Sequence, residues 1–413
     1  MSTIDSPRNT IKERERPGAI VLGGNFVGLG VARSLGAQGI PVWVYDTDAS
    51  KCIAQYSRFT KRFVASTDDI HQLLLRDGQE HGLHGWVVFA VNDEFVETLA
   101  VHRDSLETIY RIASPPLDKA RIALDKRLTY QKAQEFGIAA PWTLVTDDPA
   151  NAAKELPYPV VLKPAVNHHF FPHTNVKAIL ASTPAEFVTA FGQMRKYIPA
   201  DEILIQERIP GGGEAQFSFC AVCRDGDPYA TLVARRSRQY PIDFGNASSF
   251  VETVSQPVVE SAGKKFLEGI GFDGTAEIEF KFDARDGQYK ILDFNPRPWG
   301  WNTLGKAAGI DFVHLLYQQK VGLPISPVKA PRPASWLREI TDPLSILKSP
   351  RPAAQSLKTL GALARGRVTL ATFSVTDPIP FFAEFVLWAM KGARRQKQAK
   401  EFEAEALRAE GKG

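Results

Sequence analysis

Residues 274–299 constrain the fold and the chemistry of this chain more than any other segment. Polar and apolar residues alternate in both halves of the segment, which is typical of half-buried β-strands. Between the halves, residues 285–287 have the sequence Arg-Asp-Gly, which suits a three-residue hairpin loop with glycine at its left-handed position. Such a loop pairs Ala284 with Gln288. The segment therefore predicts one β-hairpin with a defined register.

This register places four polar side chains on one face of the hairpin. Glu279 faces Asp293, and Glu277 faces Asn295. Directly opposed side chains lie about 5 Å apart at Cβ, so the two carboxylates resist ionisation unless a cation or strong donors compensate. A metal ion is the simplest compensation. Oxygen ligands without a nearby cysteine or histidine pair favour Mg²⁺ or Mn²⁺ over Zn²⁺.

Arg297 lies two residues beyond Asn295 and is predicted to point to the same face. Its planar guanidinium can hold a phosphate or a developing oxyanion through two parallel hydrogen bonds. A solvent-facing hairpin with ordinary surface ion pairs is the alternative, although Asn-Pro-Arg-Pro-Trp at 295–299 is unusual for such a surface.

Glu279, Asp293, Asn295 and Arg297 together resemble the metal-binding and catalytic hairpin of ATP-grasp enzymes, which join a carboxylate to an amine or another nucleophile through an acyl phosphate. The resemblance covers roughly residues 18–325. It implies ATP as co-substrate, Mg²⁺ (or Mn²⁺) held by the first three residues, and Arg297 as a catalytic residue that steadies the oxyanion. The expected activity is an ATP-dependent ligase for a small-molecule carboxylate and an amine.

Two lysines precede the hairpin in the order that the resemblance requires. Lys126 lies in a helix predicted over residues 119–136, and Lys163 ends a predicted strand 37 positions later. In ATP-grasp enzymes corresponding basic residues hold the phosphates of ATP, so both are expected ATP ligands, with Lys163 also catalytic. Lys177 is expected to approach a phosphate as well. Each lysine taken alone is typical of a surface charge.

The strand predicted over residues 203–209 runs into the sequence Pro-Gly-Gly-Gly. It resembles the hinge between the two ATP-grasp subdomains, where backbone groups pair with adenine. The resemblance implies Glu207, Arg208 and Ile209 as hinge residues and Glu214 as the ribose ligand. An ordinary strand followed by a glycine turn is the alternative.

One segment departs from the ATP-grasp pattern. Where the family has a glycine-rich flap over the phosphates, residues 166–174 contain proline, aromatic residues and His168, His169 and His173. The histidines suit zinc. The proline and the aromatic residues instead favour a folded cover that is stiffer and bulkier than a glycine loop.

The segment between the hinge and the hairpin is basic. Arg236 and Arg238 share a face if the strand continues through them, and this face is expected to bind the substrate carboxylate. Trp299 follows Arg297 closely and is expected to wall the acceptor pocket. The alternatives are a solvated basic edge for the arginines and simple closure of the core for the tryptophan.

The N-terminal part has the outline of a nucleotide-binding βαβ unit. A strand over residues 19–23 leads into a glycine turn at 24–30, a helix, and a second strand that ends at Asp46. The glycines do not match the strict dinucleotide fingerprint, so the segment resembles the domain that precedes ATP-grasp domains. A nicotinamide-dependent oxidoreductase that uses this unit is one rival function, and a non-catalytic ATP-binding module is another.

The 413 residues are enough for two or three domains. The expected architecture combines α/β and α+β parts: a flexible tail at 1–17, a Rossmann-like domain at 18–115, a two-subdomain ATP-grasp fold at 116–330, and a partly helical extension at 331–413. A formal net charge of +4 is too small to suggest a nucleic-acid partner. Three cysteines and a polar N-terminus suggest a reducing, cytoplasmic location.

Residues 378–390 are mostly apolar and are followed by Lys391, Arg394, Arg395, Lys397 and Lys400. This pattern predicts an amphipathic helix. It suits peripheral contact with an anionic membrane, although such a helix more often packs on its own protein or on a second subunit, as in a homodimer.

Overall fold

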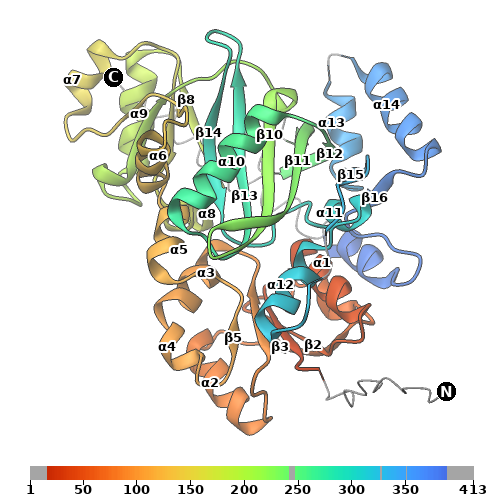
Figure 1. Ribbon diagram of the computed structural model, residues 1–413. Coiled ribbons are helices and arrows are strands. Elements are labelled where there is room, and N and C mark those ends of the chain that lie inside the picture. Colours follow the sequence, from red (N-terminus) through yellow and green to blue (C-terminus); the bar gives the residue numbers. More distant parts are fainter. Residues whose placement is uncertain (1–15, 241–246, 326–327, 350, 388–413) are drawn as a thin grey trace, which may run out of the picture.

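Three β-sheets and their helices make up the computed structural model, which describes residues 16–240, 247–325, 328–349 and 351–387. In Figure 1 the N-terminal sheet lies at the bottom, the four-stranded sheet at the upper left, and the seven-stranded sheet in the upper centre. The mixed fold class expected from the sequence is confirmed. The tail expected at 1–17 lies almost wholly outside the described residues.

The N-terminal sheet is parallel and buried on both faces. Its strands follow the order β3 (Thr60–Ala65), β2 (Val42–Asp46), β1 (Ala19–Leu22), β4 (Val87–Ala90) and β5 (Arg111–Ile112). Its helical elements are α1 (Phe26–Gly36), η1 (Ala54–Tyr56), α2 (Ile70–Glu80), α3 (Asp93–Val101) and α4 (Arg103–Leu106). Alternate residues of β1 and β4 enter two separate hydrophobic clusters, one on each side of the sheet. Such continuous apolar strands are typical of parallel sheets.

The glycine turn after β1 is packed against the protein itself. The N–H of Gly24 donates to Asp46 Oδ2 at 2.7 Å, so the acid that ends β2 binds the turn. A Cβ at Gly24 would lie only 1.9 Å from Sγ of Cys52. Packing against Cys52 therefore explains this glycine without a bound dinucleotide.

The four-stranded sheet is antiparallel and carries Lys163 and the hinge. Its order is β6 (Thr143–Leu144), β9 (Ile203–Glu207), β7 (Val160–Pro164) and β8 (Ile179–Ala181). Helices α7 (Pro149–Glu155), α8 (Asn167–Thr174) and α9 (Pro184–Met194) and the turn η2 (Ala200–Glu202) complete this part. The strand expected to reach residue 209 ends at Glu207, two residues earlier.

The single helix expected over residues 119–136 is two helices. These are α5 (Leu117–Leu124) and α6 (Lys126–Glu135). Asp125, between them, has an extended backbone with φ −104° and ψ 110°, and its side chain caps α6. The N–H of Lys126 donates to the carbonyl of Ala165, just after β7, at 3.0 Å. The break therefore fixes Lys126 at the first turn of α6 and beside the end of β7.

The seven-stranded sheet contains the hairpin. Its order is β14 (Gln288–Asn295), β13 (Gly274–Asp283), β10 (Gln216–Arg224), β11 (Asp227–Tyr240), β12 (Ala247–Thr253), β15 (Ser335–Leu337) and β16 (Val368–Leu370). Its neighbours include η3 (Gly213–Ala215), α10 (Pro257–Ile270), α11 (Thr303–Ala308) and α12 (Phe312–Val321). Only the β15–β16 pair is parallel among these described strands.

The hairpin reaches the expected register by a different route. Asp283 pairs with Gln288, so the loop has four residues instead of the expected three. Leu292 is then an extra residue on β14, which shifts the pairing by one position. The two departures cancel, so Glu279 still pairs with Asp293, and the second predicted pair also forms.

Gly263 is expected to be required where α10 packs on β10. A Cβ at this position would lie 2.2 Å from the ring of Phe219. Gly263→Ala is therefore expected to lower the free energy of unfolding by about 1–3 kcal/mol, measured by urea denaturation. Gly192→Ala in α9 is the matched control, because nothing lies within 4 Å of its Cβ position. It should leave stability unchanged or raise it, by up to about 1 kcal/mol. Equal effects at both glycines would contradict this packing.

The C-terminal extension is joined to the rest of the protein by buried ion pairs. Besides β15 and β16 it contains α13 (Asp342–Leu347) and α14 (Pro352–Ala364). Arg238 in β11 lies 2.7 Å from Asp342, and Arg33 in α1 lies 2.9 Å from Asp377. Every helix in the described ranges is too short or too polar to cross a membrane. The helix expected over residues 378–390 lies partly outside the described residues.

Candidate active site

The acidic residues predicted to bind metal are paired with basic side chains. Arg236 Nη2 lies 3.0 Å from Glu279 Oε1, and Lys126 Nζ lies 2.9 Å from Asp293 Oδ1. The carboxylates of this hairpin do not form a group of three within 4.8 Å of one another, although all of them are described. The compensation expected from a metal ion is therefore supplied by Arg236 and Lys126 in this structure.

Glu277 is a further acid on this face, and it is buried. It shares hydrogen bonds of 3.0 Å with Ser218 and 3.1 Å with Asn295. Burial, together with the neighbouring Glu279, raises the pKa of Glu277 to about 8. Burial therefore disfavours the charged form of this carboxyl.

Arg297 is held by a residue from the N-terminal sheet. Its Nε donates to Asp93 Oδ1 at 2.7 Å, and its Nη2 donates to Asn295 Oδ1 at 3.2 Å. Burial alone would lower the pKa of Arg297, but the carboxylate of Asp93 raises it. From the sequence, Asp93 is expected either to shape substrate access at a strand end or to cap a helix, and its pairing with Arg297 was not predicted. Its place directly after β4, at the carboxyl edge of a parallel sheet, is the signal that points to it.

Lys163 and Lys177 lie close to the same acids. Burial, followed by the charge of Lys126, lowers the pKa of Lys163 to about 8. Partial desolvation also lowers the pKa of Lys177, although this residue remains exposed, and attraction to Glu279 and Asp293 offsets only part of the effect. The predicted lysines from α6, β7 and the segment before β8 therefore converge on the hairpin.

A pocket of about 110 Å³ lies between the hinge and the hairpin. Its lining includes Lys163, Lys281, Gln206, Gln216 and the predicted hinge residues Glu207, Arg208 and Ile209. Oε1 of Gln206 and Oε1 of Gln216 are buried and have no hydrogen-bond partner among the described residues. Buried acceptors of this kind are normally paired, so they indicate a ligand that donates hydrogen bonds.

Several predicted nucleotide residues make contacts within the protein. The Glu207 carboxylate accepts from Lys290 Nζ at 2.9 Å, so its backbone, more than its side chain, is available to the pocket. Glu214 Oε1 accepts from the N–H of Gly212 at 3.0 Å. Glu214 must therefore leave its own loop to bind a ribose.

The segment that replaces the glycine flap is the helix α8. His168 Nε2 lies 2.9 Å from Glu97 of α3, and His169 Nδ1 lies 2.9 Å from Glu202. His173 stacks on Tyr197. The three histidines therefore have three different partners and do not gather as a zinc site, although Glu97, His168 and His169 offer atoms within 4.8 Å of one another. The presence of helix α8 supports the expectation of a folded cover in place of a glycine flap.

Two of the three residues predicted to bind substrate, Arg238 and Trp299, lie away from the cluster. A β-bulge between Arg236 and Arg238 changes the alternation of β11, so the two arginines do not share a face. Arg238 is buried against Asp342, while Arg236 reaches Glu279. Trp299 is 1% exposed and belongs to the hydrophobic core, so it does not form the wall of an acceptor pocket.

Comparisons with known proteins find both relatives in sequence and similar solved structures. No family model matches the chain. It is 24% identical over 251 residues to a D-aspartate ligase of Enterococcus faecium, covering 57% of this chain and 59% of that protein. It is 23% identical over 232 residues to the carbamoyl phosphate synthase large chain of Thermomicrobium roseum, covering 54% of this chain and 21% of that one. The chain thus spans less than two thirds of both relatives.

The fold is also found among solved structures. The ADP complex of PurK, an N5-carboxyaminoimidazole ribonucleotide synthetase, superposes with a TM-score of 0.61 at 15% identity. The match covers 78% of this chain and 81% of that one. At 15% identity this likeness establishes the fold alone, so the chemistry has to be inferred from the geometry of the site.

Proposed function

We propose that this chain, a member of the ATP-grasp superfamily, is an ATP- and Mg²⁺-dependent ligase that activates a small-molecule carboxylate as an acyl phosphate and joins it to an amine. The observation that carries the proposal is the convergence of Lys126, Lys163, Lys177, Arg236 and Arg297 on one acidic hairpin beside the hinge pocket.

The charge of this cluster suits a polyphosphate. Five basic side chains face the four acids Asp93, Glu277, Glu279 and Asp293, and burial raises the pKa of Glu277. Basic side chains are in excess, and one of them, Lys126, is buried, where an unbalanced charge is costly. Binding of ATP phosphates supplies the missing negative charge. We assign this role to Lys126, Lys163 and Lys177.

The donor set fits a hard divalent cation, because Glu279, Asp293 and Asn295 offer only oxygen atoms from adjacent strands. When bound there, Mg²⁺ would neutralise charge on the ATP phosphates. Lys126 and Arg236 would then exchange their carboxylate partners for phosphate and substrate oxygens. The adenine amino group would donate to the unpaired acceptors of the hinge pocket.

The chemical steps need no side-chain nucleophile. A substrate carboxylate oxygen attacks the γ-phosphorus, the bond from that phosphorus to the ADP oxygen breaks, and an acyl phosphate forms. The amine nitrogen then attacks the acyl carbon, phosphate leaves, and the nitrogen loses a proton. Arg236 orients the carboxylate and Arg297 stabilises the oxyanion. Catalysis is therefore mainly positioning and fixed charge.

A screen of amino acids and other small acids in pairs, with Mg²⁺ and ATP, tests the proposal through phosphate release. The proposal predicts release that depends on one acid and one amine. A non-catalytic ATP-binding module would bind ATP and release no phosphate with any pair, and a nicotinamide-dependent oxidoreductase would turn over no ATP.

Arg297→Ala is expected to lower kcat by about 100- to 1000-fold, because the variant loses a fixed charge at the developing oxyanion. Binding of a fluorescent ATP analogue should persist. Arg224→Ala is the matched control, because Arg224 lies exposed on β10, outside the cluster, and its loss should leave kcat unchanged. Wild-type turnover by the Arg297 variant would refute the role of this residue.

A further inference from the structure

Helix α14 contacts the body of the protein through polar side chains, because Gln355 and Thr359 accept from Arg238 and Lys358 pairs with Glu252. None of its 13 residues is buried, and Leu357 and Leu360 are 69% and 60% exposed. A groove of about 610 Å³ lies between the helix and strands β12 and β15, and Leu357 lies on its helix side. A helix of this length is marginal alone and gains stability by burying an apolar face. No described part of the chain covers these leucines.

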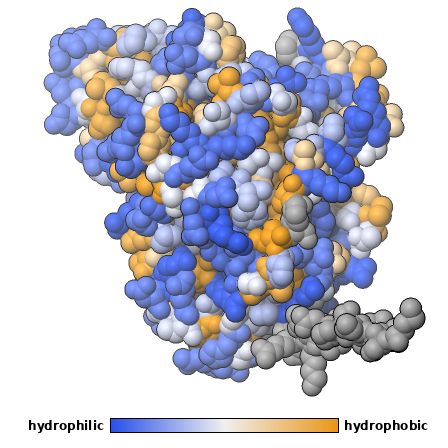
Figure 2. Space-filling model, viewed as in Figure 1, coloured by the Kyte–Doolittle hydropathy of each residue, from blue (hydrophilic) through white to orange (hydrophobic). Residues whose placement is uncertain are grey.

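Exposed apolar side chains concentrate in the same part of the protein. Of the sixteen large hydrophobic side chains that are exposed in the described chain, nine lie between residues 347 and 386. Leu347, Val375 and Phe382 are among them, at 75%, 84% and 60% exposed. In Figure 2, orange atoms mark the right-hand edge, where Figure 1 places α14 and the residues that follow β16.

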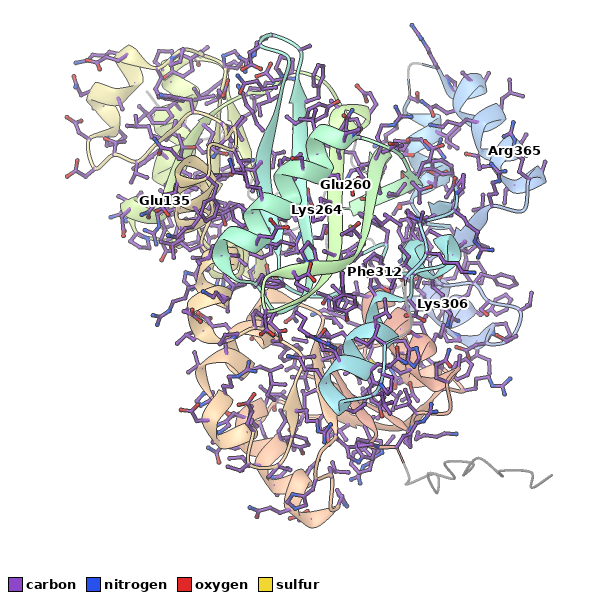
Figure 3. All side chains as sticks on the ribbon, viewed as in Figure 1. Glu135, Glu260, Lys264, Lys306, Phe312 and Arg365 are labelled. Atoms are coloured by element: carbon purple, nitrogen blue, oxygen red, sulfur yellow. The ribbon has the colours of Figure 1, made fainter. Side chains whose placement is uncertain are left out.

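The charged residues within this segment are all basic, and one of them, Lys358, is paired with Glu252 of β12. No acidic residue lies between Asp342 and Asp377, whereas five basic residues do, at positions 348, 351, 358, 365 and 367. Figure 3 shows Arg365 at the outer edge of the molecule. Exposed leucine and phenylalanine beside lysine and arginine is the composition of helices that lie in a membrane interface, and anionic lipids attract each such cation.

The residues that follow β16 are anchored by contacts with the rest of the protein. Arg338 forms two hydrogen bonds to Glu384. Asp377 is 2% exposed and accepts from Arg33, from Ser57 and from the N–H of Arg58. The residues after β16 are thereby fixed to α1 and to the N-terminal sheet.

An anionic lipid surface matches these features better than other partners. In a two-fold contact the same patch meets itself, so a second copy would place lysine and arginine against lysine and arginine. A nucleic acid backbone would match the charge but not the exposed leucines. We propose that the exposed face of α13, α14 and residues 371–387 binds an anionic membrane surface peripherally. This inference does not depend on the ligase activity.

Vesicle sedimentation of the full chain tests this proposal without ATP. Wild-type protein is expected to bind vesicles of phosphatidylcholine with phosphatidylglycerol at least about tenfold more than phosphatidylcholine alone, and less as salt increases. Leu357→Asp with Leu360→Asp should reduce binding about tenfold, as should Arg351→Glu with Arg365→Glu. Val188→Asp with Val258→Asp is the matched control, because both valines are exposed on other helices, and binding should not change.

Three results would overturn the proposal. The first is wild-type protein that stays in the supernatant or binds neutral and anionic vesicles equally. The second is unchanged vesicle binding by both double variants of α14, provided that each variant still unfolds in a thermal transition and is therefore folded. The third is light scattering that shows a dimer lost on Leu357→Asp with Leu360→Asp, which would make a second copy the partner.

Discussion

Asp293→Asn is expected to lower substrate-dependent ADP formation by about a thousandfold while the fold is retained. The substitution keeps the size of the side chain and removes its charge. It replaces a charged carboxylate of the proposed metal site with a neutral amide and leaves Lys126, now 2.9 Å from Asp293, without a negative partner. Coupled ADP detection at saturating acid and amine measures the effect, and circular dichroism reports the fold.

Asp286→Asn is the matched control for this substitution. Asp286 lies in the loop of the same hairpin and pairs with Lys290 at 3.0 Å, away from the cluster. The same chemical change there should leave ADP formation within about twofold of wild type, because surface ion pairs contribute little. Equal activity of the two variants would remove Asp293 from the site.

Arg238→Met is expected to lower the free energy of unfolding by about 3–5 kcal/mol. Arg238 and Asp342 are 5% and 1% exposed at their side chains, so the variant leaves a buried carboxylate without its partner. The guanidinium of Arg238 also lies 4.2 Å from the centroid of the Phe250 ring, and the variant loses this cation–π contact. Urea denaturation measures the loss, and activity per folded molecule should stay near the wild-type value.

Arg236→Met provides the comparison, since it removes the same charge two positions earlier. Arg236 pairs with Glu279 in the cluster, so its loss should raise KM for the acid and change stability less than Arg238→Met. The opposite pattern, with KM altered by Arg238→Met and stability by Arg236→Met, would contradict the assignment of these two arginines.

The sequence predicted the hairpin because its alternation is strong and its polar residues lie at fixed spacing. Two local details were wrong and happened to compensate: the loop has four residues, and Leu292 forms a bulge. Neither leaves a clear mark in the residue pattern. The bulge in β11 had no compensating partner, so the expectation that Arg236 and Arg238 share a face was wrong.

The site was predictable where it depends on order along the chain, and not where it depends on contacts between distant segments. Lys126 and Lys163 converge on the hairpin as expected. The pairing of Asp93 with Arg297 joins residues 204 positions apart, and no local pattern encodes it. The raised pKa of Glu277 likewise follows from burial, which a strand pattern shows only as alternation.

The transfer of oxygen from the acid to phosphate tests the central claim most directly. Once the screen has identified a substrate pair, the acid is labelled with ¹⁸O in its carboxylate and the released phosphate is analysed by mass spectrometry. Activation as an acyl phosphate predicts one labelled oxygen in each phosphate, because the bond between carbon and that oxygen breaks when the amine attacks. Phosphate released without label, alongside the amide product, would contradict the account.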